Sequence, residues 1–143
     1  MTVAAILSGK GRDIISEKAS TPLSRICEVL AEKGIGAILI TDGSGHIEGI
    51  ISERDIVKAV ARQGSKALNF PVGDVMTRSV VTCSEDATIN EIMNKMSQGR
   101  FRHVPVVTDE KAVGVISIGD VVKFRIAQVE QEAEHMRSYI TTA

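Results

Sequence analysis

Hydrophobic and polar positions follow the same order of patterns in the two halves of this chain. In the first half, apolar residues recur at helical spacing over residues 23–30, which predicts an amphipathic helix that ends at Gly34. Short apolar runs predict strands over 37–41 and 47–51, and helical spacing returns over 53–62. The pattern is therefore that of a mixed helix and strand unit.

The segment before the first of these helices gives two further predictions. A short strand is expected near residues 13–16. The dipeptide Thr21-Pro22 predicts a helix with Thr21 as its N-cap and Pro22 as its first residue, because Pro lacks the N–H that this position leaves unbonded.

The second half repeats the order of the first. We expect a strand over 80–83, a helix over 88–98, and strands over 104–108 and 112–117. Pro105 interrupts one of these strands, and Pro has no N–H to give to a neighbouring strand. This strand should therefore lie at a sheet edge or a bulge.

The final helix is longer than its counterpart in the first half. Its apolar residues lie alternately four and three positions apart, which is the a/d pattern of a coiled coil over about two and a half heptads. Two placements fit this stripe, one against the chain's own module and one against a second subunit. The stripe consists of Val122, Ile126, Val129, Ala133, Met136 and Ile140.

A ten-residue segment occurs twice, 65 positions apart (114 minus 49). Residues 49–58 have the sequence GIISERDIVK, and residues 114–123 have the sequence GVISIGDVVK. Each half is too small to bury a core alone, so the two repeats should pack together and leave two related clefts. We divide the chain into a lead-in over 1–13, a first repeat over 14–68, a linker over 69–77, a second repeat over 78–128 and a helical extension over 129–143.

Composition and charge exclude several classes of protein. The chain is 43% hydrophobic and 24% charged, which is typical of a globular protein. Its net charge of −1 and its lack of a basic stripe argue against binding to nucleic acid. The apolar run at residues 3–7 is too short for a signal peptide or a membrane span. We expect a soluble cytoplasmic protein with no membrane partner.

Residues suited to redox, metal or catalytic chemistry are few and scattered. Cys27 and Cys83 occupy unmatched positions in the two repeats, so a disulfide is not expected, and redox sensing through Cys83 is a minor alternative. The three histidines lack the spacing of metal ligands, and no nucleophile stands beside a base. We therefore expect no metal site, no catalytic residues and no enzymatic activity.

The repeated segment carries a Ser-x-x-Asp motif, as Ser52 with Asp55 and as Ser117 with Asp120, at a predicted strand-to-helix junction. One interpretation is a capping box, in which the two side chains bond to backbone N–H groups. The other is a ligand site, because a helix N-terminus attracts phosphate and a carboxylate can accept hydrogen bonds from two ribose hydroxyls. The two interpretations are compatible.

Basic residues precede one strand of the second repeat, in the order Arg100-Phe101-Arg102-His103. The planar guanidinium of arginine suits phosphate oxygens. Combined with a repeated Ser-x-x-Asp motif, this segment indicates a candidate anion site.

Taken together, these features resemble a tandem pair of CBS (cystathionine β-synthase) domains, also called a Bateman module. The resemblance rests on the doubled Gly-x-Ile-Ser-x-x-Asp core, the Arg-His-Val-Pro-Val-Val strand and the linker over 72–77. It spans about residues 11–128, as in a small stand-alone member. It implies an α+β fold of two α/β sandwich repeats packed with pseudo-twofold symmetry, followed here by an extended C-terminal helix.

The resemblance further implies a regulatory module that binds an adenosine nucleotide between its repeats. AMP is the first choice of ligand, ATP or NAD(H) are alternatives, and no cofactor is required. The implied nucleotide-binding residues, some of them placed by pattern more than by identity, are Lys18, Ser52, Arg54, Asp55, Thr82, Arg102, His103, Ser117 and Asp120.

The two copies differ where the basic strand occurs. The first repeat has residues 36–39, Gly-Ala-Ile-Leu, in place of the Arg-His-Val-Pro stretch, and Arg54 offers only partial compensation. We expect the two clefts to differ in affinity. The resemblance also implies a homodimer formed through helices and an unidentified regulated protein. The alternative function is a ligand-free scaffold in which the Ser-x-x-Asp motifs act only as helix caps.

Overall fold

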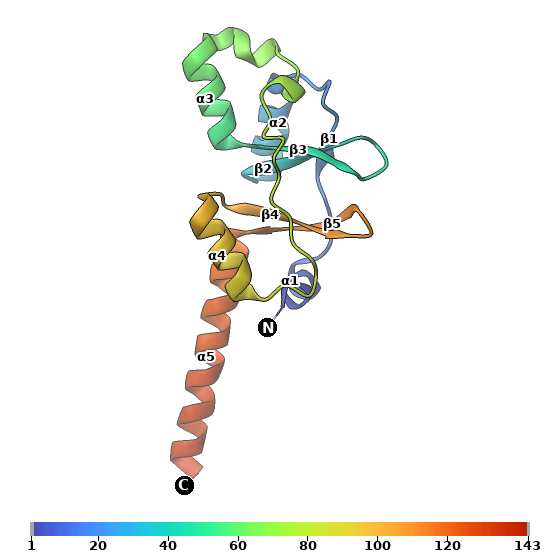
Figure 1. Ribbon diagram of the computed structural model, residues 1–143. Coiled ribbons are helices and arrows are strands. Elements are labelled where there is room, and N and C mark those ends of the chain that lie inside the picture. Colours follow the sequence, from blue (N-terminus) through green and yellow to red (C-terminus); the bar gives the residue numbers. More distant parts are fainter. Residues whose placement is uncertain (1, 143) are drawn as a thin grey trace.

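Two small sheets, one from each half of the chain, lie next to each other at the centre of the molecule (Figure 1). The computed structural model describes residues 2–142. The first sheet contains β1 (Ser16–Glu17), β2 (Ala37–Thr41) and β3 (Ile47–Ser52) in that order, with β1 parallel and β3 antiparallel to β2. The second pairs β4 (His103–Thr108) with β5 (Lys111–Ser117) in antiparallel fashion. The short first strand begins at Ser16, at the end of the predicted range.

The helices of the first half are α2 (Leu23–Lys33) and α3 (Glu53–Gln63), followed by the 3-10 turns η1 (Gly64–Asn69) and η2 (Val72–Asp74). Gly34 ends α2 as predicted, with a left-handed φ of 62° and an N–H that bonds to the carbonyl of Leu30. The predicted start of this helix is wrong. Pro22 is the N-cap. The N–H of Leu23 donates to the carbonyl of Phe70 (2.9 Å), and the hydroxyl of Thr21 donates to Glu17 and caps no helix N–H.

The second half contains α4 (Ile89–Gly99) and α5 (Ile118–Thr142) beside its sheet. The strand predicted over 80–83 is wrong, because only Cys83 forms a bridge, to Val106. The carbonyl of Pro105 accepts from the N–H of Cys83 (3.0 Å). Within a strand, the nitrogen and the carbonyl of one residue point to the same side. The nitrogen of Pro105, which has no hydrogen to donate, therefore faces the edge of the sheet where Cys83 makes the bridge, and not β5.

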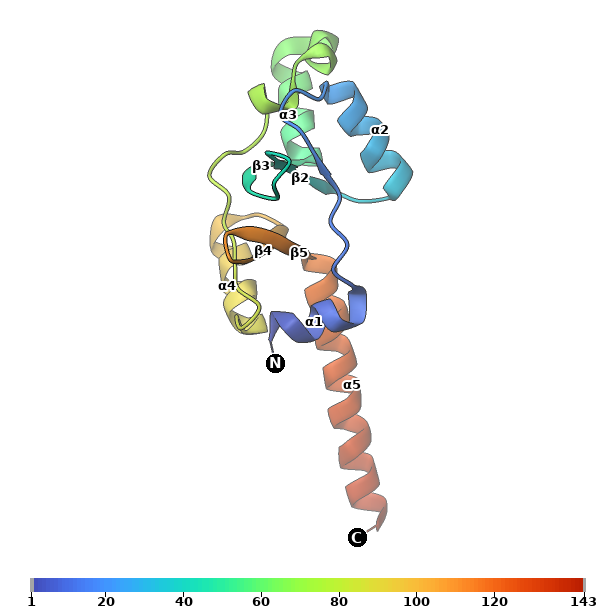
Figure 2. The same cartoon turned by 90° about the vertical axis from the view of Figure 1, so that its right-hand side faces the viewer.

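The helix α1 (Val3–Lys10) packs into the second half of the molecule, far along the chain from its own position. Val3, Ile6 and Leu7 are buried in one hydrophobic cluster with residues such as Ile89 and Ile116. The first half has its own cluster, built on α2, β2 and the linker. After α1 the chain crosses to the first half, as Figure 2 shows. Each sheet is thus packed by helices that bury separate cores, so the prediction that each half is too small to bury a core alone is wrong.

The glycine that opens each repeated segment is tightly covered. A Cβ on Gly114 would lie 2.7 Å from Leu7 Cδ2, and one on Gly49 would lie 2.6 Å from Met76 Sδ. Helix α1 therefore covers the second repeat as the linker covers the first. In this position, the C-terminal end of α1 lies at the junction of β5 and α5, where Lys10 bonds to Val115 and Asp120.

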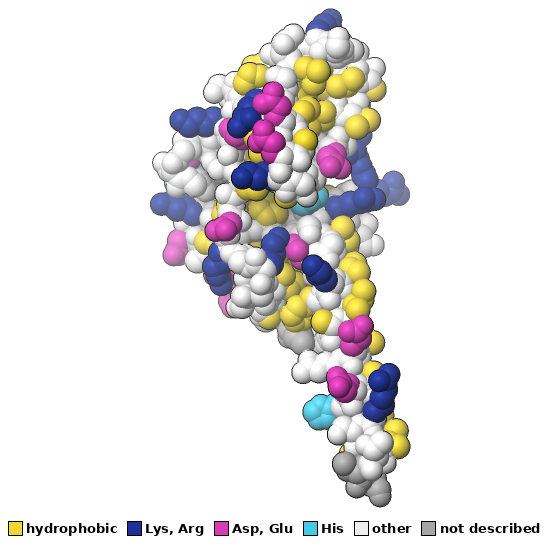
Figure 3. Space-filling view, turned by 180° about the vertical axis from the view of Figure 1, so that it is seen from behind, with side chains coloured by type: hydrophobic (Ala, Val, Ile, Leu, Met, Phe, Trp, Pro, Cys, Tyr) yellow, Lys and Arg dark blue, Asp and Glu magenta, His cyan; other side chains and the backbone are white. Residues whose placement is uncertain are grey.

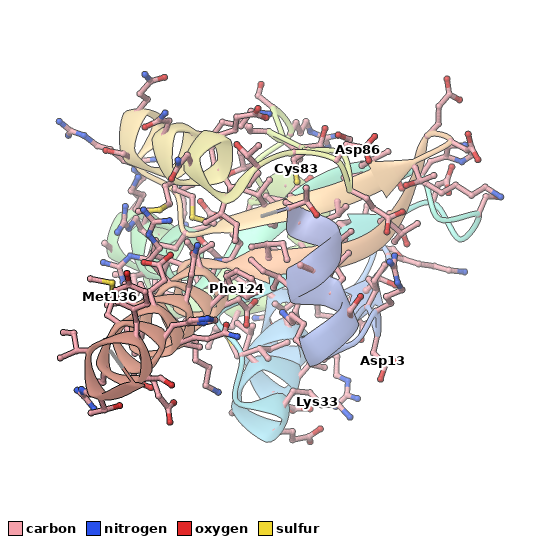
Figure 4. The ribbon with its side chains drawn as sticks, turned by 90° about the horizontal axis from the view of Figure 1, so that it is seen from below. Asp13, Lys33, Cys83, Asp86, Phe124 and Met136 are labelled. Carbon is pink, nitrogen blue, oxygen red and sulfur yellow. The ribbon has the colours of Figure 1, made fainter. Side chains whose placement is uncertain are left out.

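Helix α5 leaves the second half and extends away from both sheets (Figures 1 and 2). Val121 is buried and Phe124 packs against the core of the second half. Seen from below, Met136 lies on the other side of the helix from Phe124 (Figure 4). The apolar stripe is exposed, from 49% at Val122 to 68% at Ile140, so of the two placements that the sequence left open, the one against the chain's own module is wrong.

Candidate functional site

A cavity of about 320 Å³ lies between the two halves of the molecule. Its size is at the lower end of the range of small-molecule sites, about 300–1,000 Å³. The first half contributes mostly apolar or backbone surface, and the second contributes polar side chains. The lining residues are Lys10, Asp13, Ile15, residues 34–39, Ile50, His103, Val115, Ser117 and Asp120.

Ser117 and Asp120 form a reciprocal cap at the start of α5. The N–H of Ser117 donates to Asp120 Oδ2 (2.9 Å), and the N–H of Asp120 donates to Ser117 Oγ (3.1 Å). The capping interpretation therefore describes this motif correctly. Because both residues also line the cavity, capping and ligand binding remain compatible here.

Lys10 lies at the same point and was not among the predicted residues. Its Nζ donates to Asp120 Oδ2 (2.6 Å) and to the carbonyl of Val115 (2.8 Å). Burial opposes ionisation of Asp120, but the bonds from Lys10 and Ser117 outweigh it and hold the pKa of this carboxyl below its ordinary value. No sequence motif marks Lys10, since 110 positions separate it from Asp120.

His103 enters the cavity from the first residue of β4. Burial lowers the pKa of this imidazole, and the attraction of nearby Asp120 only partly opposes that effect. The side chain is therefore mostly neutral at pH 7, able to donate and accept hydrogen bonds. A Cβ on Gly36 would lie 3.3 Å from His103 Cε1, so the absence of a side chain there leaves room beside the ring.

The first repeat builds the same cap with a different neighbour. The N–H of Ser52 donates to Asp55 Oδ2 (3.0 Å), and the N–H of Asp55 donates to Ser52 Oγ (3.3 Å). Thr77 Oγ1 then donates to Asp55 Oδ1 (3.3 Å), where the second repeat has the ammonium of Lys10. The two motifs share a backbone arrangement but differ in the charge beside the carboxylate.

The structure places the other predicted residues outside the lining of this cavity. Arg54 Nη1 donates to the carbonyl of Arg100 (3.3 Å), so this arginine joins the two halves of the molecule. The carbonyl of Thr82 accepts from Lys95 Nζ (3.0 Å), while Lys18 and Arg102 are exposed. Of the nine predicted residues, the cavity brings together His103, Ser117 and Asp120.

The thiols are poorly placed for redox chemistry. Cys83 is buried, and burial raises the pKa of its thiol to about 11. Burial also raises the pKa of Cys27. Across residues 2–142, no three His, Cys, Asp or Glu side chains are grouped so that they could hold a metal ion. None of the helices described is long and apolar enough to cross a membrane.

Comparison with known proteins identifies the family. A family model described as "CBS domain" matches this chain twice, at residues 10–62 and 72–127. The mitochondrial CBS domain-containing protein CBSX3 of Arabidopsis thaliana is 30% identical over 115 residues, which cover 78% of this chain and 56% of that protein. The chain thus spans about half the length of this curated relative, and about a fifth of the longer CBSCBSPB2 of the same plant.

Solved structures agree in fold. The CBS-domain protein ATU1752 of Agrobacterium tumefaciens is 42% identical, with a TM-score of 0.85 over 87% of this chain and 99% of that chain. The CBS domain pair of MJ0100, solved with 5′-methylthioadenosine and S-adenosyl-L-methionine, is 27% identical, with a TM-score of 0.80 over 90% and 98% of the two chains. PAE2072 of Pyrobaculum aerophilum, solved with AMP, is 25% identical, with a TM-score of 0.74 over 84% and 89%.

The predicted fold class, a pair of mixed helix and strand repeats with a long C-terminal helix, is confirmed by these matches. The predicted family is confirmed by the doubled match of the family model. This chain therefore belongs to the CBS domain family, and it contains a tandem pair of CBS repeats.

Proposed function

We propose that this chain is a regulatory module that binds an adenosine nucleotide, with AMP as the first candidate, in the cavity between its repeats. The observation that carries the proposal is the position of the Ser117–Asp120 cap, which lines a cavity of about 320 Å³ at the N-terminus of a long helix. Two similar CBS proteins were solved with adenosine ligands, which supports the choice of ligand class.

The side chains of the cavity suit the parts of a nucleotide. The bonds from Ser117 and Lys10 both end on Oδ2 of Asp120, and Oδ1 would accept hydrogen bonds from the ribose. The N-terminus of α5 and the ammonium of Lys10 favour a phosphate group. The apolar surface of β2 would pack against the base.

Regulation requires that the ligand bind one arrangement of the module more tightly than another. Asp120 lies in the first turn of α5, so a nucleotide that bonds to Asp120 acts directly on this helix. The proposed readout is a change in the position of α5, or in a dimer that contains it, which a regulated protein would recognise.

The test is unfolding temperature against AMP, ADP, ATP, NAD, NADH and GTP, followed by calorimetric titration of any ligand that shifts it. A ligand at about 100 times its Kd adds about 2.7 kcal/mol to the free energy of unfolding, a shift of several degrees. Asp120→Asn keeps an oxygen for the Ser117 N–H and should weaken binding at this cavity at least ten-fold. Asp55→Asn is the matched control in the other repeat. Absence of a shift with all six nucleotides, or an equal loss in both variants, would contradict the proposal.

A ligand-free scaffold is the second candidate, because both Ser-x-x-Asp motifs form reciprocal caps. Asp120→Ala separates the two functions. Loss of a cap lowers the free energy of unfolding of the ligand-free chain by about 0.5–2 kcal/mol under either function. Only the nucleotide-binding function predicts that AMP affinity is lost as well.

A further inference from the structure

Among the described residues that line the cavity between the repeats, Lys10 is the one lysine or arginine. It is the last residue of α1, and its Nζ is held at the start of α5 by bonds to Asp120 Oδ2 (2.6 Å) and to the carbonyl of Val115 (2.8 Å). Figure 3 shows charged side chains and a histidine at the level where the two halves meet on that side of the molecule. Because His103 in the lining is mostly neutral at pH 7, the positive charge of the cavity depends on Lys10.

We propose that Lys10 is a specificity-determining residue, which makes the cavity select an adenosine ligand with a negatively charged 5′ group and reject one with a positively charged 5′ group. This inference rests on the proposed function, and it names the class of adenosine ligand that the site accepts. It ranks AMP above the neutral nucleoside adenosine, and adenosine above a derivative with a 5′ ammonium or sulfonium.

The first repeat shows that the helix cap itself needs no positive charge. There the neutral hydroxyl of Thr77 donates to Asp55 Oδ1 (3.3 Å), where the second repeat has the ammonium of Lys10. The two backbone bonds of the first cap are 3.0 and 3.3 Å long, and those of the second are 2.9 and 3.1 Å long. The two caps therefore have nearly the same geometry, and a structural role in the cap does not explain the charge of Lys10.

Lys10 keeps the capacity to bond to a ligand. An ammonium group has three N–H donors, and the side chain of Asp120 and the carbonyl of Val115 accept two of them. The side chains of Lys10 and Asp120 are 38% and 21% exposed, so both groups can be reached from the cavity. The third N–H of Lys10 is therefore available to a negatively charged group bound beside Asp120.

The 5′ group of an adenosine bound through its ribose would lie close to both charges, because it is only a few bonds from the hydroxyls that Asp120 would accept. Asp120 alone would repel a 5′ phosphate and attract a 5′ cation. Lys10 reverses this preference, since its ammonium neutralises Asp120 and forms charge-assisted hydrogen bonds with phosphate oxygens. Asp13, the second carboxylate of the lining, is exposed, so water weakens its effect on the ligand.

The test is calorimetric titration of the full chain at pH 7 with three ligands that differ in the charge of the 5′ group. AMP is negative, adenosine is neutral, and 5′-amino-5′-deoxyadenosine is positive. Lys10→Met removes the ammonium and should raise the Kd of AMP about ten-fold or more, the usual effect of losing a hydrogen bond between charged groups. The Kd of adenosine should change by less than about three-fold, and that of the amino derivative should fall. Because each ligand is compared with itself, differences in ligand size cancel.

Two further variants serve as controls. Lys10→Arg keeps the positive charge and should keep the preference for AMP over adenosine. Lys58→Met removes a lysine that is exposed in α3 and outside the lining, and should leave all three Kd values within about two-fold. An equal loss of all three ligands in Lys10→Met, or an unchanged preference for AMP, overturns the inference and leaves the adenosine site standing. If none of the three binds to the unaltered chain, the proposed function is contradicted, and the inference with it.

Discussion

The ion pair between Lys10 and Asp120 should couple α1 to the start of α5, and a double-mutant cycle measures that coupling. The variants are Lys10→Met, Asp120→Asn and the two combined. Lys10→Met keeps most of the aliphatic stem and removes the ammonium. Because the cycle cancels effects that each residue has alone, the bond from Lys10 to the carbonyl of Val115 and the cap with Ser117 do not enter the result.

The expected coupling follows from the geometry of the pair. Two unit charges 2.6 Å apart attract each other by about 1.6 kcal/mol in bulk water. Desolvation and ordering reduce that value, and exposed pairs measure about 0.2–1 kcal/mol. The side chains of Lys10 and Asp120 are 38% and 21% exposed, which places this pair at the upper end, about 1 kcal/mol. Arg25 with Glu28 is the control pair, exposed by 49% and 63%, and its coupling should be near zero.

The pH dependence gives the prediction a sign. The folded pKa of Asp120 lies below its ordinary value, so the coupling is fully present above the unfolded pKa of about 3.9 and is lost as pH falls through the folded pKa. Urea unfolding at pH 7, 5.5 and 3.5 provides the free energies. A coupling below about 0.3 kcal/mol at pH 7, or one that is larger at pH 3.5 than at pH 7, would refute the assignment of this contact as an ion pair.

Two further predictions concern the packing of the repeats and the thiols. Gly49→Ala puts a Cβ 2.6 Å from Met76 Sδ and 2.8 Å from the carbonyl oxygen of Thr77, and should lower the free energy of unfolding in urea by about 1–3 kcal/mol. Gly9→Ala, in helix α1 with nothing within 4 Å, should instead be neutral or stabilising, and equal losses would contradict the packing argument. In a Cys27→Ser variant, Cys83 should react with a thiol reagent at pH 8 only after unfolding. With a pKa of about 11, roughly one Cys83 thiol in a thousand is ionised at pH 8. Fast labelling of the native protein would restore the redox hypothesis.

Local patterns in the sequence were sufficient where neighbouring residues decide the structure. The helix end at Gly34 and the caps at Ser52 and Ser117 depend on residues within a few positions of each other. The repeated segment also located the strand-to-helix junction that lines the cavity. These features are predictable because backbone bonding at a helix terminus is a local property.

The features that the sequence analysis did not predict depend on contacts between residues that are far apart in the chain. The N–H of Leu23 is taken by the carbonyl of Phe70, which shifts a helix start that Thr21-Pro22 alone predicts one residue earlier. Helix α1 joins the core of the second repeat, and no local pattern predicts that this contact places Lys10 beside Asp120. His103, the first residue of β4, lines the cavity, whereas the adjacent Arg102 precedes the strand, is exposed and does not line it.

The length of α5 has a mechanical consequence. Its 25 residues make a rod of about 37 Å, held at one end by Asp120 and Phe124 and extending away from the module at the other. A rotation of about 5° at the first turn carries the far end through about 3 Å, a displacement comparable to a side chain. Under the proposed function, small adjustments around the cavity would be amplified along this lever arm, with the largest displacement at the end of the helix that is farthest from the cavity.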